Sequence, residues 1–206
     1  MDDVTVVVPA YEEAGRIGRV VSELVGTYRV LVVDDGSTDE TATEARAAGA
    51  TVVEQATNEG YISALKRGFR AAETPIVVTY DADGEHRPGD VARLASAIES
   101  HDLDLVLGAR STIPRPSERL LNRLTRAKVE VTDSGTGLRA IRRDLAVDLE
   151  LDTVCTCGTL VLEAAANGAR IGEIPIETRD IEKPRGIAWG HARQLWHVLR
   201  YLWRDR

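Results

Sequence analysis

The sequence predicts an α/β protein with a mostly parallel central sheet and helices on both faces. In the first hundred residues, short β-rich runs alternate with helical stretches, which is the pattern of a parallel sheet covered on both sides. The chain has 206 residues, of which 43% are hydrophobic and 29% charged, as in a globular protein with a full core. We therefore expect one compact α/β unit.

The first half divides into five expected strands and four expected helices. In the first expected helix, four apolar residues share one face, and the second follows a Ser37–Glu40 capping sequence. The fourth has Pro88 in its first turn, where proline is tolerated. The expected strands are Val4–Val8, Arg29–Val33, Thr51–Glu54, Ile76–Tyr80 and Leu103–Leu107. The expected helices are Glu12–Val25, Thr41–Ala48, Glu59–Ala72 and Pro88–Ser100.

The second half is less regular. Residues 110–128 predict a loop followed by a helix, because Pro114 and Pro116 interrupt the start. A turn at Ser134–Gly137 leads into Leu138–Ile141. A helix is expected over Thr159–Ala166, a strand over Ile171–Ile176 and a charged loop over 178–186. We find no repeat or linker.

Polar clusters follow three of the expected strands. They are Pro9–Glu13, Asp34–Ser37 and Asp81–Glu85. In open parallel sheets, ligands bind beyond the carboxyl ends of the strands. We therefore expect the three clusters to form one composite site.

Asp81 and Asp83 are the most informative pair in this site. Residues i and i+2 of an extended chain point the same way, so both carboxylates can face one ligand. Mg²⁺ is commonly held by one or two carboxylates together with substrate phosphates. The pair therefore predicts a site for a divalent cation and a diphosphate.

The net charge of −7 argues against a nucleic-acid partner. Basic residues comprise three lysines and 23 arginines. This composition is consistent either with adaptation to high salt or with a GC-rich genome, and a stability curve against KCl distinguishes the two. Cys155 and Cys157 are too few for a zinc site, which usually needs four ligands.

These segments, in this order, resemble the inverting family 2 glycosyltransferases of the GT-A fold, particularly the dolichyl-phosphate mannose and glucose synthases. The resemblance extends to about residue 186 and rests on the combination of motifs. The matching stretches are Val8–Glu13, Val33–Asp39, Asn58–Gly60, Ala64–Leu65, Gly68–Phe69, Asp81–His86, Gly108–Arg110, Asp133, Thr136–Ala140 and Gly172–Ile176. The sequence departs from the family where Gly60-Tyr61-Ile62 replaces the usual Gly-Lys-Gly.

The resemblance implies a role for each matching position. Asp81 and Asp83, with Glu85, would hold Mg²⁺ or Mn²⁺ and the donor diphosphate. Arg110 and Arg139 would bind phosphate, and Asp81, Asp83 and Arg139 would be the catalytic residues. The residues implied to bind the nucleotide sugar are Pro9, Tyr11, Glu13, Val33, Asp35, Ala82, Glu85 and Arg110.

The expected acceptor is a lipid phosphate. An alcohol acceptor needs a general base, whereas the second ionisation of a phosphate monoester lies near about pH 6, so it arrives as a nucleophile. We find neither the later acid pair nor the Gln-x-x-Arg-Trp motif of alcohol-using members. Lys183 and Arg185 are expected to help bind phosphate and close the site.

The last segment predicts a basic amphipathic helix over residues 188–206, after a GT-A domain over residues 1–187. Tryptophans and leucines at helical spacing lie among arginines and histidines. Such a helix either lies on an anionic membrane or packs on the core. No apolar run is long enough to span a bilayer.

Together these observations predict a metal-dependent hexosyltransferase. We expect transfer of a hexose, with inversion, from a nucleotide sugar of the GDP-mannose or UDP-glucose type to polyprenyl or dolichyl phosphate. We expect a cytoplasmic protein, peripheral at the cytoplasmic face of the membrane. Two alternatives remain: a transferase acting on a glycan hydroxyl, and a non-catalytic nucleotide-sugar-binding protein.

Overall fold

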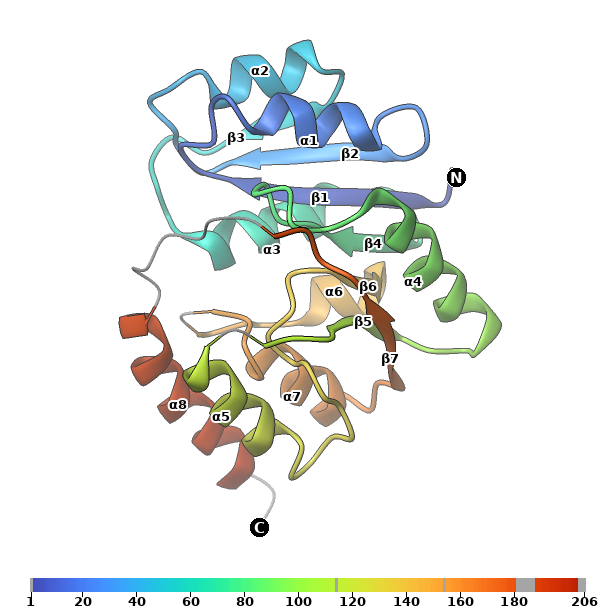
Figure 1. Cartoon of the computed structure of the whole chain (residues 1–206), viewed down its shortest axis with the longest axis vertical. Helices are drawn as coiled ribbons and strands as arrows, with labels where there is room; N and C mark the ends of the chain where they lie inside the picture. Colours follow the sequence, from blue (N-terminus) through green and yellow to red (C-terminus); the bar gives the residue numbers. More distant parts are fainter. Residues whose placement is uncertain (1, 114, 154, 181–187, 204–206) are drawn as a thin grey trace.

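A computed structural model describes residues 2–113, 115–153, 155–180 and 188–203. Within these residues, seven strands form one sheet in the order β3-β2-β1-β4-β6-β5-β7 (Figure 1). The strands are β1 (Val4–Ala10), β2 (Arg29–Asp34), β3 (Thr51–Glu54), β4 (Ile76–Thr79), β5 (Leu105–Arg110), β6 (Arg139–Arg142) and β7 (Ile171–Ile176).

The sheet is parallel except for one strand. β1 pairs in parallel with β2 and β4, β2 with β3, and β5 with β7. β6 pairs antiparallel with both β4 and β5. The predicted α/β class with a mostly parallel sheet is confirmed, whereas strand β6 was not predicted.

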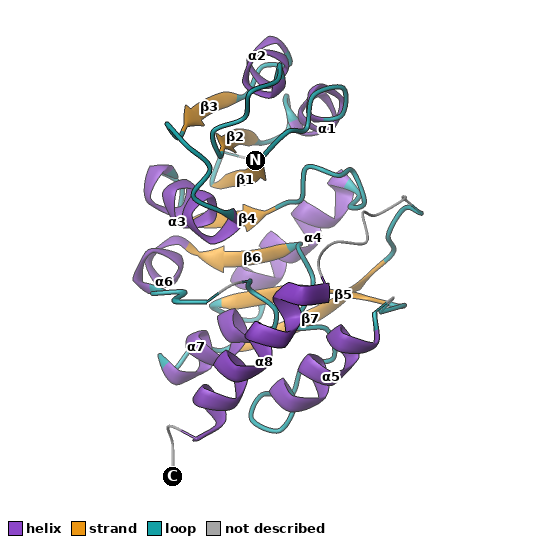
Figure 2. Ribbon diagram, turned by 90° about the vertical axis from the view of Figure 1, so that its left-hand side faces the viewer, coloured by secondary structure: helices purple, strands orange, loops and turns teal. Residues whose placement is uncertain are grey.

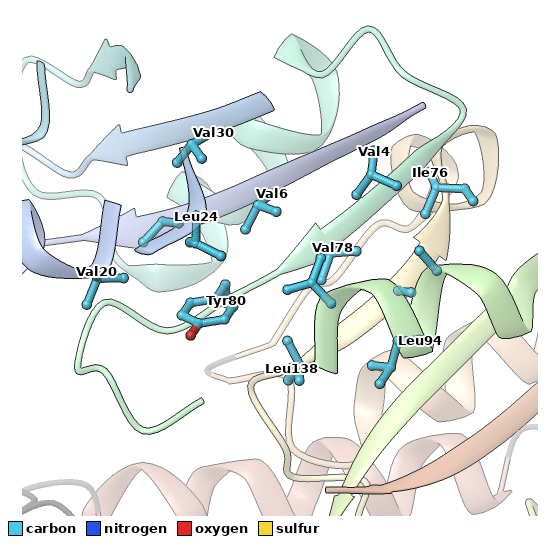
Figure 3. Packing of buried hydrophobic residues seen from close by; sticks show 14 of the residues in the cluster. Val4, Val6, Val20, Leu24, Val30, Ile76, Val78, Tyr80, Leu94 and Leu138 are labelled. Carbon is cyan, nitrogen blue, oxygen red and sulfur yellow. The ribbon is translucent and has the colours of Figure 1, made fainter. Parts of the chain in front are cut away.

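Helices cover both faces of the sheet, as Figure 2 shows with α3 and α6 on one side and α1 and α4 on the other. One core cluster joins alternate residues of β1 to α1 and α4, and includes Val6, Val78 and Leu94 (Figure 3). The other joins the opposite side chains to α3, α6 and α7. The helices are α1 (Ile17–Leu24), α2 (Thr41–Ala47), α3 (Tyr61–Ala71), α4 (Pro88–Ser100), α5 (Pro116–Thr125), α6 (Arg143–Asp148), α7 (Thr159–Ala166) and α8 (Ala188–Trp203).

A smaller apolar cluster joins α5, α7 and α8. Its buried members are Leu121, Leu162 and Val198, one from each helix. α8 is therefore fixed to the rest of the molecule by its own hydrophobic contacts. Among the described helices, none has both the length and the apolarity to cross a bilayer.

The first helix begins at Ile17, five residues later than Glu12, where it was predicted to begin. The reason is that backbone N–H groups just before it bond to side chains that follow β2. The N–H of Glu13 donates to Thr41 Oγ1 at 2.8 Å and that of Gly15 to Glu44 Oε2 at 2.8 Å. The N–H of Glu12 and Ala14 donate likewise to Ser37 and Asp39. We call residues 12–15 and 37–44 the interlocked loops.

α3 approaches the sheet closely because Gly68 has no side chain. A Cβ at this position would lie 2.3 Å from Cγ1 of Val7 in β1. Both contact surfaces belong to the core, so neither can move freely. Gly68 therefore sets the separation between α3 and the sheet.

Replacing Gly68 with alanine should lower the free energy of unfolding by about 1–3 kcal/mol, because the added methyl overpacks the core. Chemical denaturation measures this change. Gly89→Ala is the matched control, since a Cβ there meets nothing within 4 Å and lies inside helix α4. That variant should be neutral or slightly stabilised. Equal stability of the two variants would contradict the packing argument.

Candidate active site

Four segments meet at one edge of the sheet. The parallel strands β1, β2 and β4 end there at Ala10, Asp34 and Thr79, while antiparallel β6 begins there at Arg139, opposite Thr79. We call this edge the polar rim, made of residues 11–16, 35–40, 80–87 and 133–139. The three predicted clusters therefore share one edge, and the start of β6 adds a fourth.

Asp81 lies at the centre of the rim. Its carboxylate packs against the backbone of Gly137, where a Cβ would lie only 1.9 Å from Asp81 Oδ2. The Thr79 hydroxyl donates to the Gly137 carbonyl at 2.6 Å, which holds the two segments together. The Asp81 side chain is 28% exposed, so one side of it faces solvent. Gly137 thus provides the space that the Asp81 carboxylate occupies.

Asp81, Glu85 and His86 form a group able to hold a divalent cation. One ligand atom from each lies within 4.8 Å of the others. His86 is completely buried, and neither ring nitrogen has a hydrogen-bond partner among the described residues. Its Nε2 lies 3.5 Å from Asp81 Oδ2. Carboxylate oxygens with an imidazole nitrogen are a donor set that divalent metals accept.

Asp83 lies outside that group, although it was predicted to be a metal ligand with Asp81 and Glu85. Its Oδ1 accepts the backbone N–H of Glu85 at 3.0 Å. It is also close to Glu13: burial raises the pKa of Glu13, and the negative charge of Asp83 raises it further. Asp83 and Glu13 therefore form a second acidic locus at the rim, and the metal role of Asp83 stays a prediction.

Arg139 carries a buried positive charge at the start of β6, opposite Thr79. Its side chain is 1% exposed, and its Nε and Nη1 atoms find no acceptor in the described part of the chain. Its guanidinium donates to the hydroxyl of Tyr61, the first residue of α3. The pKa of that hydroxyl is raised by burial and by Asp81, against the opposing effect of Arg139. Arg139 thus presents unused donors that suit an anion.

Arg110 is held by carboxylates. Its Nε and Nη2 donate to Asp133 at 2.7 and 3.0 Å, and Nη2 lies 3.2 Å from Glu118. Burial opposes the charge on Arg110, yet the bonds to Asp133 outweigh it and raise its pKa. Arg110 therefore joins Asp133 and Glu118 in a buried ion-pair group. Its predicted contact with the donor phosphate stays a prediction.

The residues predicted to bind base and ribose lie along β1, β2 and the loops after them. Pro9 and Val33 are register partners on β1 and β2. Tyr11 is 46% exposed at the rim, whereas Ala82 is buried. Asp35 is buried and accepts the N–H groups of residues 59 and 60, each at 2.8 Å, so it fixes the start of α3.

Five residues remain in the comparison between the predicted site and the structure: two that were predicted and three that were not. Lys183 and Arg185 lie outside the described residues. The role of His86 was missed, although it ends the Asp81–His86 motif. Tyr61 was visible only as a departure from the family pattern, and Gly137 only as part of a motif. Their importance comes from contacts across the sheet, which sequence spacing does not encode.

Asp133→Asn should destabilise the protein by about 3 kcal/mol near neutral pH, because it leaves Arg110 buried with less compensating charge. Burial alone would raise the pKa of Asp133, but the hydrogen bond from Arg110 prevails and lowers it. A lowered pKa contributes stability above the unfolded value of about 3.9 that is lost as the pH falls through the folded value. The difference between variant and wild type in urea unfolding should therefore shrink below about pH 4.

Asp144→Asn is the control for this measurement, since the Asp144 side chain is 99% exposed. It should change stability little at any pH. A constant difference between Asp133→Asn and wild type from pH 7 to pH 2 would contradict the charge-pair explanation.

Comparison with known proteins places this architecture in a family. Residues 5–161 match the sequence model of glycosyl transferase family 2. The chain is similar to the dolichyl-phosphate hexose transferase of Haloferax volcanii, at 33% identity over 196 residues, covering 87% of this chain and 84% of that protein. It is also similar to the undecaprenyl-phosphate mannosyltransferase of Micrococcus luteus, at 30% identity over 204 residues, covering 84% and 82% of the two chains.

A solved structure shares the fold. Glucosyl-3-phosphoglycerate synthase from Mycobacterium tuberculosis, in complex with Mn²⁺, UDP-glucose and phosphoglyceric acid, aligns with a TM-score of 0.81 at 23% identity, covering 95% of this chain and 78% of that one. At this identity the likeness supports the fold alone. The family model and the two relatives show that the chain belongs to glycosyltransferase family 2: it is a glycosyltransferase enzyme with the GT-A fold.

Proposed function

We propose that this glycosyltransferase transfers a hexose from a nucleotide diphosphate sugar to a polyprenyl or dolichyl phosphate, with inversion at the anomeric carbon. The donor is of the GDP-mannose or UDP-glucose type. The acceptor phosphate attacks the anomeric carbon directly while the nucleoside diphosphate leaves. The catalytic residues of the proposal are Asp81, Asp83 and Arg139.

Arg139 is the observation that carries this proposal. A buried guanidinium with two unused donor atoms is costly unless an anion compensates it. Guanidinium suits phosphate because its N–H groups can contact two oxygens at once. The same guanidinium donates a hydrogen bond to the Tyr61 hydroxyl, while its Nε and Nη1 have no acceptor among the described residues.

A lipid phosphate is the acceptor that the chemistry favours. Near neutral pH it is already ionised and needs no base, consistent with the missing motifs of alcohol-using members. The Haloferax and Micrococcus relatives are named for dolichyl phosphate and undecaprenyl phosphate, respectively. Those acceptors belong to the relatives and support the same class for this chain.

The cation of the proposal is Mg²⁺ or Mn²⁺. Asp81, Glu85 and His86 would hold it, with Asp83 as the further ligand expected from the family motif. When bound, such a cation neutralises charge on the leaving diphosphate. The orphaned, buried ring of His86 is the feature that fits this set.

The chain's own residues position the reactants. The interlocked loops fix Tyr11 and Glu13 relative to the residues after β2, so the proposed nucleotide site is preformed. Gly137 seats the Asp81 carboxylate, and Arg139 orients an attacking or leaving phosphate. We place the enzyme peripherally at the cytoplasmic face of the membrane, where a lipid phosphate and a soluble donor can meet.

Gly137→Ala should weaken Mn²⁺ binding at least tenfold and reduce turnover similarly, because the new methyl displaces the Asp81 carboxylate. The free energy of unfolding should change little, because the atoms that the methyl displaces are the carboxylate atoms at the end of the Asp81 side chain, which can move without shifting the backbone. Calorimetric titration of Mn²⁺ with UDP or GDP measures the affinity. Gly135→Ala is the matched control in the same loop, where a Cβ has only ordinary contacts from 3.7 Å. Unchanged Mn²⁺ affinity in Gly137→Ala would contradict the role of Asp81.

Wild-type enzyme should consume a nucleotide sugar in the presence of dolichyl phosphate and Mg²⁺ or Mn²⁺. The assay supplies radiolabelled GDP-mannose or UDP-glucose as donor. Transfer is measured as the radioactivity that the lipid product carries into an organic solvent. Asp83→Ala should lose at least 100-fold in kcat while remaining folded, as expected for loss of charge stabilisation at the leaving group.

Three other outcomes would contradict the proposal. Transfer to phosphoglycerate or a glycan, but not to lipid phosphate, would show a hydroxyl acceptor. Binding of the nucleotide sugar without turnover on any acceptor would show that the protein is a non-catalytic nucleotide-sugar-binding protein. Full activity of Asp83→Ala would remove the proposed role of that residue.

A further inference from the structure

α8 has two opposite faces. Gln194 and Val198 are fully buried against the molecule, whereas Trp196, Leu199 and Trp203 are 61%, 38% and 80% exposed. At 100° per residue, the exposed three lie on the side of the helix directly opposite the buried two. The two tryptophans are two turns apart, about 10 Å along the axis. The exposed face is therefore an apolar stripe that no described residue covers.

Polar anchors hold the inner face of α8 in place. Gln194 Oε1 accepts the N–H of Cys155 at 3.2 Å, and its Nε2 donates to the Cys157 carbonyl at 3.0 Å. The Tyr201 hydroxyl donates to Glu163 Oε2 at 3.0 Å. Because these bonds and the apolar cluster with α5 and α7 fix the helix, turning the tryptophans inward would break them. Their exposure is a fixed property of the fold.

α5 lies beside α8, as Figures 1 and 2 both show, and we treat the exposed residues of the two neighbouring helices as one surface. It adds Leu120, which is 49% exposed. The exposed charged residues of this surface are all basic: Arg119, Arg123, Arg126 and Arg200. Over residues 116–126 and 194–203 the single carboxylate is that of Glu118, which is buried and paired with Arg110 and Arg115.

We propose that this surface, the α5–α8 face of Leu120, Trp196, Leu199 and Trp203 with its four arginines, binds the surface of an anionic lipid bilayer. Interfacial helices combine an apolar face bearing Trp and Leu with basic residues that contact lipid headgroups. The four arginines give this face a local positive charge that complements an anionic surface, even though the whole chain carries a net charge of −7. Arg200 lies 5.8 Å from the Trp196 ring, so charge and apolar area reach the surface together.

The position of the face suits the proposed reaction, on which this inference rests. α5 begins at Pro116, six residues after β5 ends at the same sheet edge as the polar rim. The start of α5 therefore lies on the side of the molecule where the rim lies, which suits an enzyme whose proposed acceptor is held in a membrane.

Vesicle sedimentation with the full chain tests the inference. Wild type should bind vesicles of equal parts phosphatidylcholine and phosphatidylglycerol, bind phosphatidylcholine alone at least tenfold more weakly, and dissociate as salt rises. The double variant Trp196→Ser, Trp203→Ser should lose at least tenfold in partitioning, with an unchanged circular dichroism spectrum. Val25→Ser is the matched control, because Val25 is an exposed apolar residue outside this face and should leave binding unchanged.

Two measurements separate this inference from the proposed function. Lipids with brominated acyl chains should quench tryptophan fluorescence in wild type and much less in the double variant. In detergent with a short-chain prenyl phosphate, both proteins should turn over equally. If neither protein turns over the prenyl phosphate while wild type still binds vesicles, the proposed function is contradicted but the membrane-binding role of the α5–α8 face is not.

Binding to no vesicle, or binding that the double variant retains, would overturn the inference. A dimer that forms without lipid and dissociates in the double variant would also overturn it, since a second copy would then be the occupant of the face.

Discussion

The contact between Asp81 and Gly137 is the constraint on which the rest of the site depends. Asp81 follows a parallel strand and Gly137 precedes an antiparallel one, so the two segments reach the same edge from opposite directions. Reversing the direction of β6 would carry Gly137 and Arg139 to the far end of the sheet. The antiparallel direction of β6 therefore brings Arg139 to the same sheet edge as Asp81, and the proposed phosphate and cation sites both depend on it.

Opposite charges are kept in separate places around this contact. At the end of β1, burial raises the pKa of Glu13 and the charge of Asp83 raises it further, against the opposing effect of the ion pair with Arg16. Arg139, at the start of β6, has two donor atoms without an acceptor among the described residues, and we propose that an anion binds them. Arg110 is instead neutralised by Asp133 and Glu118, so it supports the loop before α5. The rim thus combines carboxylates that suit the proposed cation with guanidinium donors that suit the proposed phosphates.

Local patterns in the sequence were enough to predict the alternating elements and the shared edge of the three polar clusters. They were insufficient where a distant partner decides the outcome. The first helix begins late because side chains of residues 37–44 take the N–H groups that would have started it. Strand β6 has four residues with arginine at both ends, and only its pairing with β4 and β5 identifies it. His86 and Tyr61 matter through neighbours on other elements, which no spacing rule reports.

The interlocked loops tie two connections of the first half of the chain to each other. Four consecutive amides in one connection depend on side chains of another, so an insertion in either would break both. A change of length in one of these two connections should therefore be tolerated only together with a matching change in the other, so the pair behaves as a single structural unit.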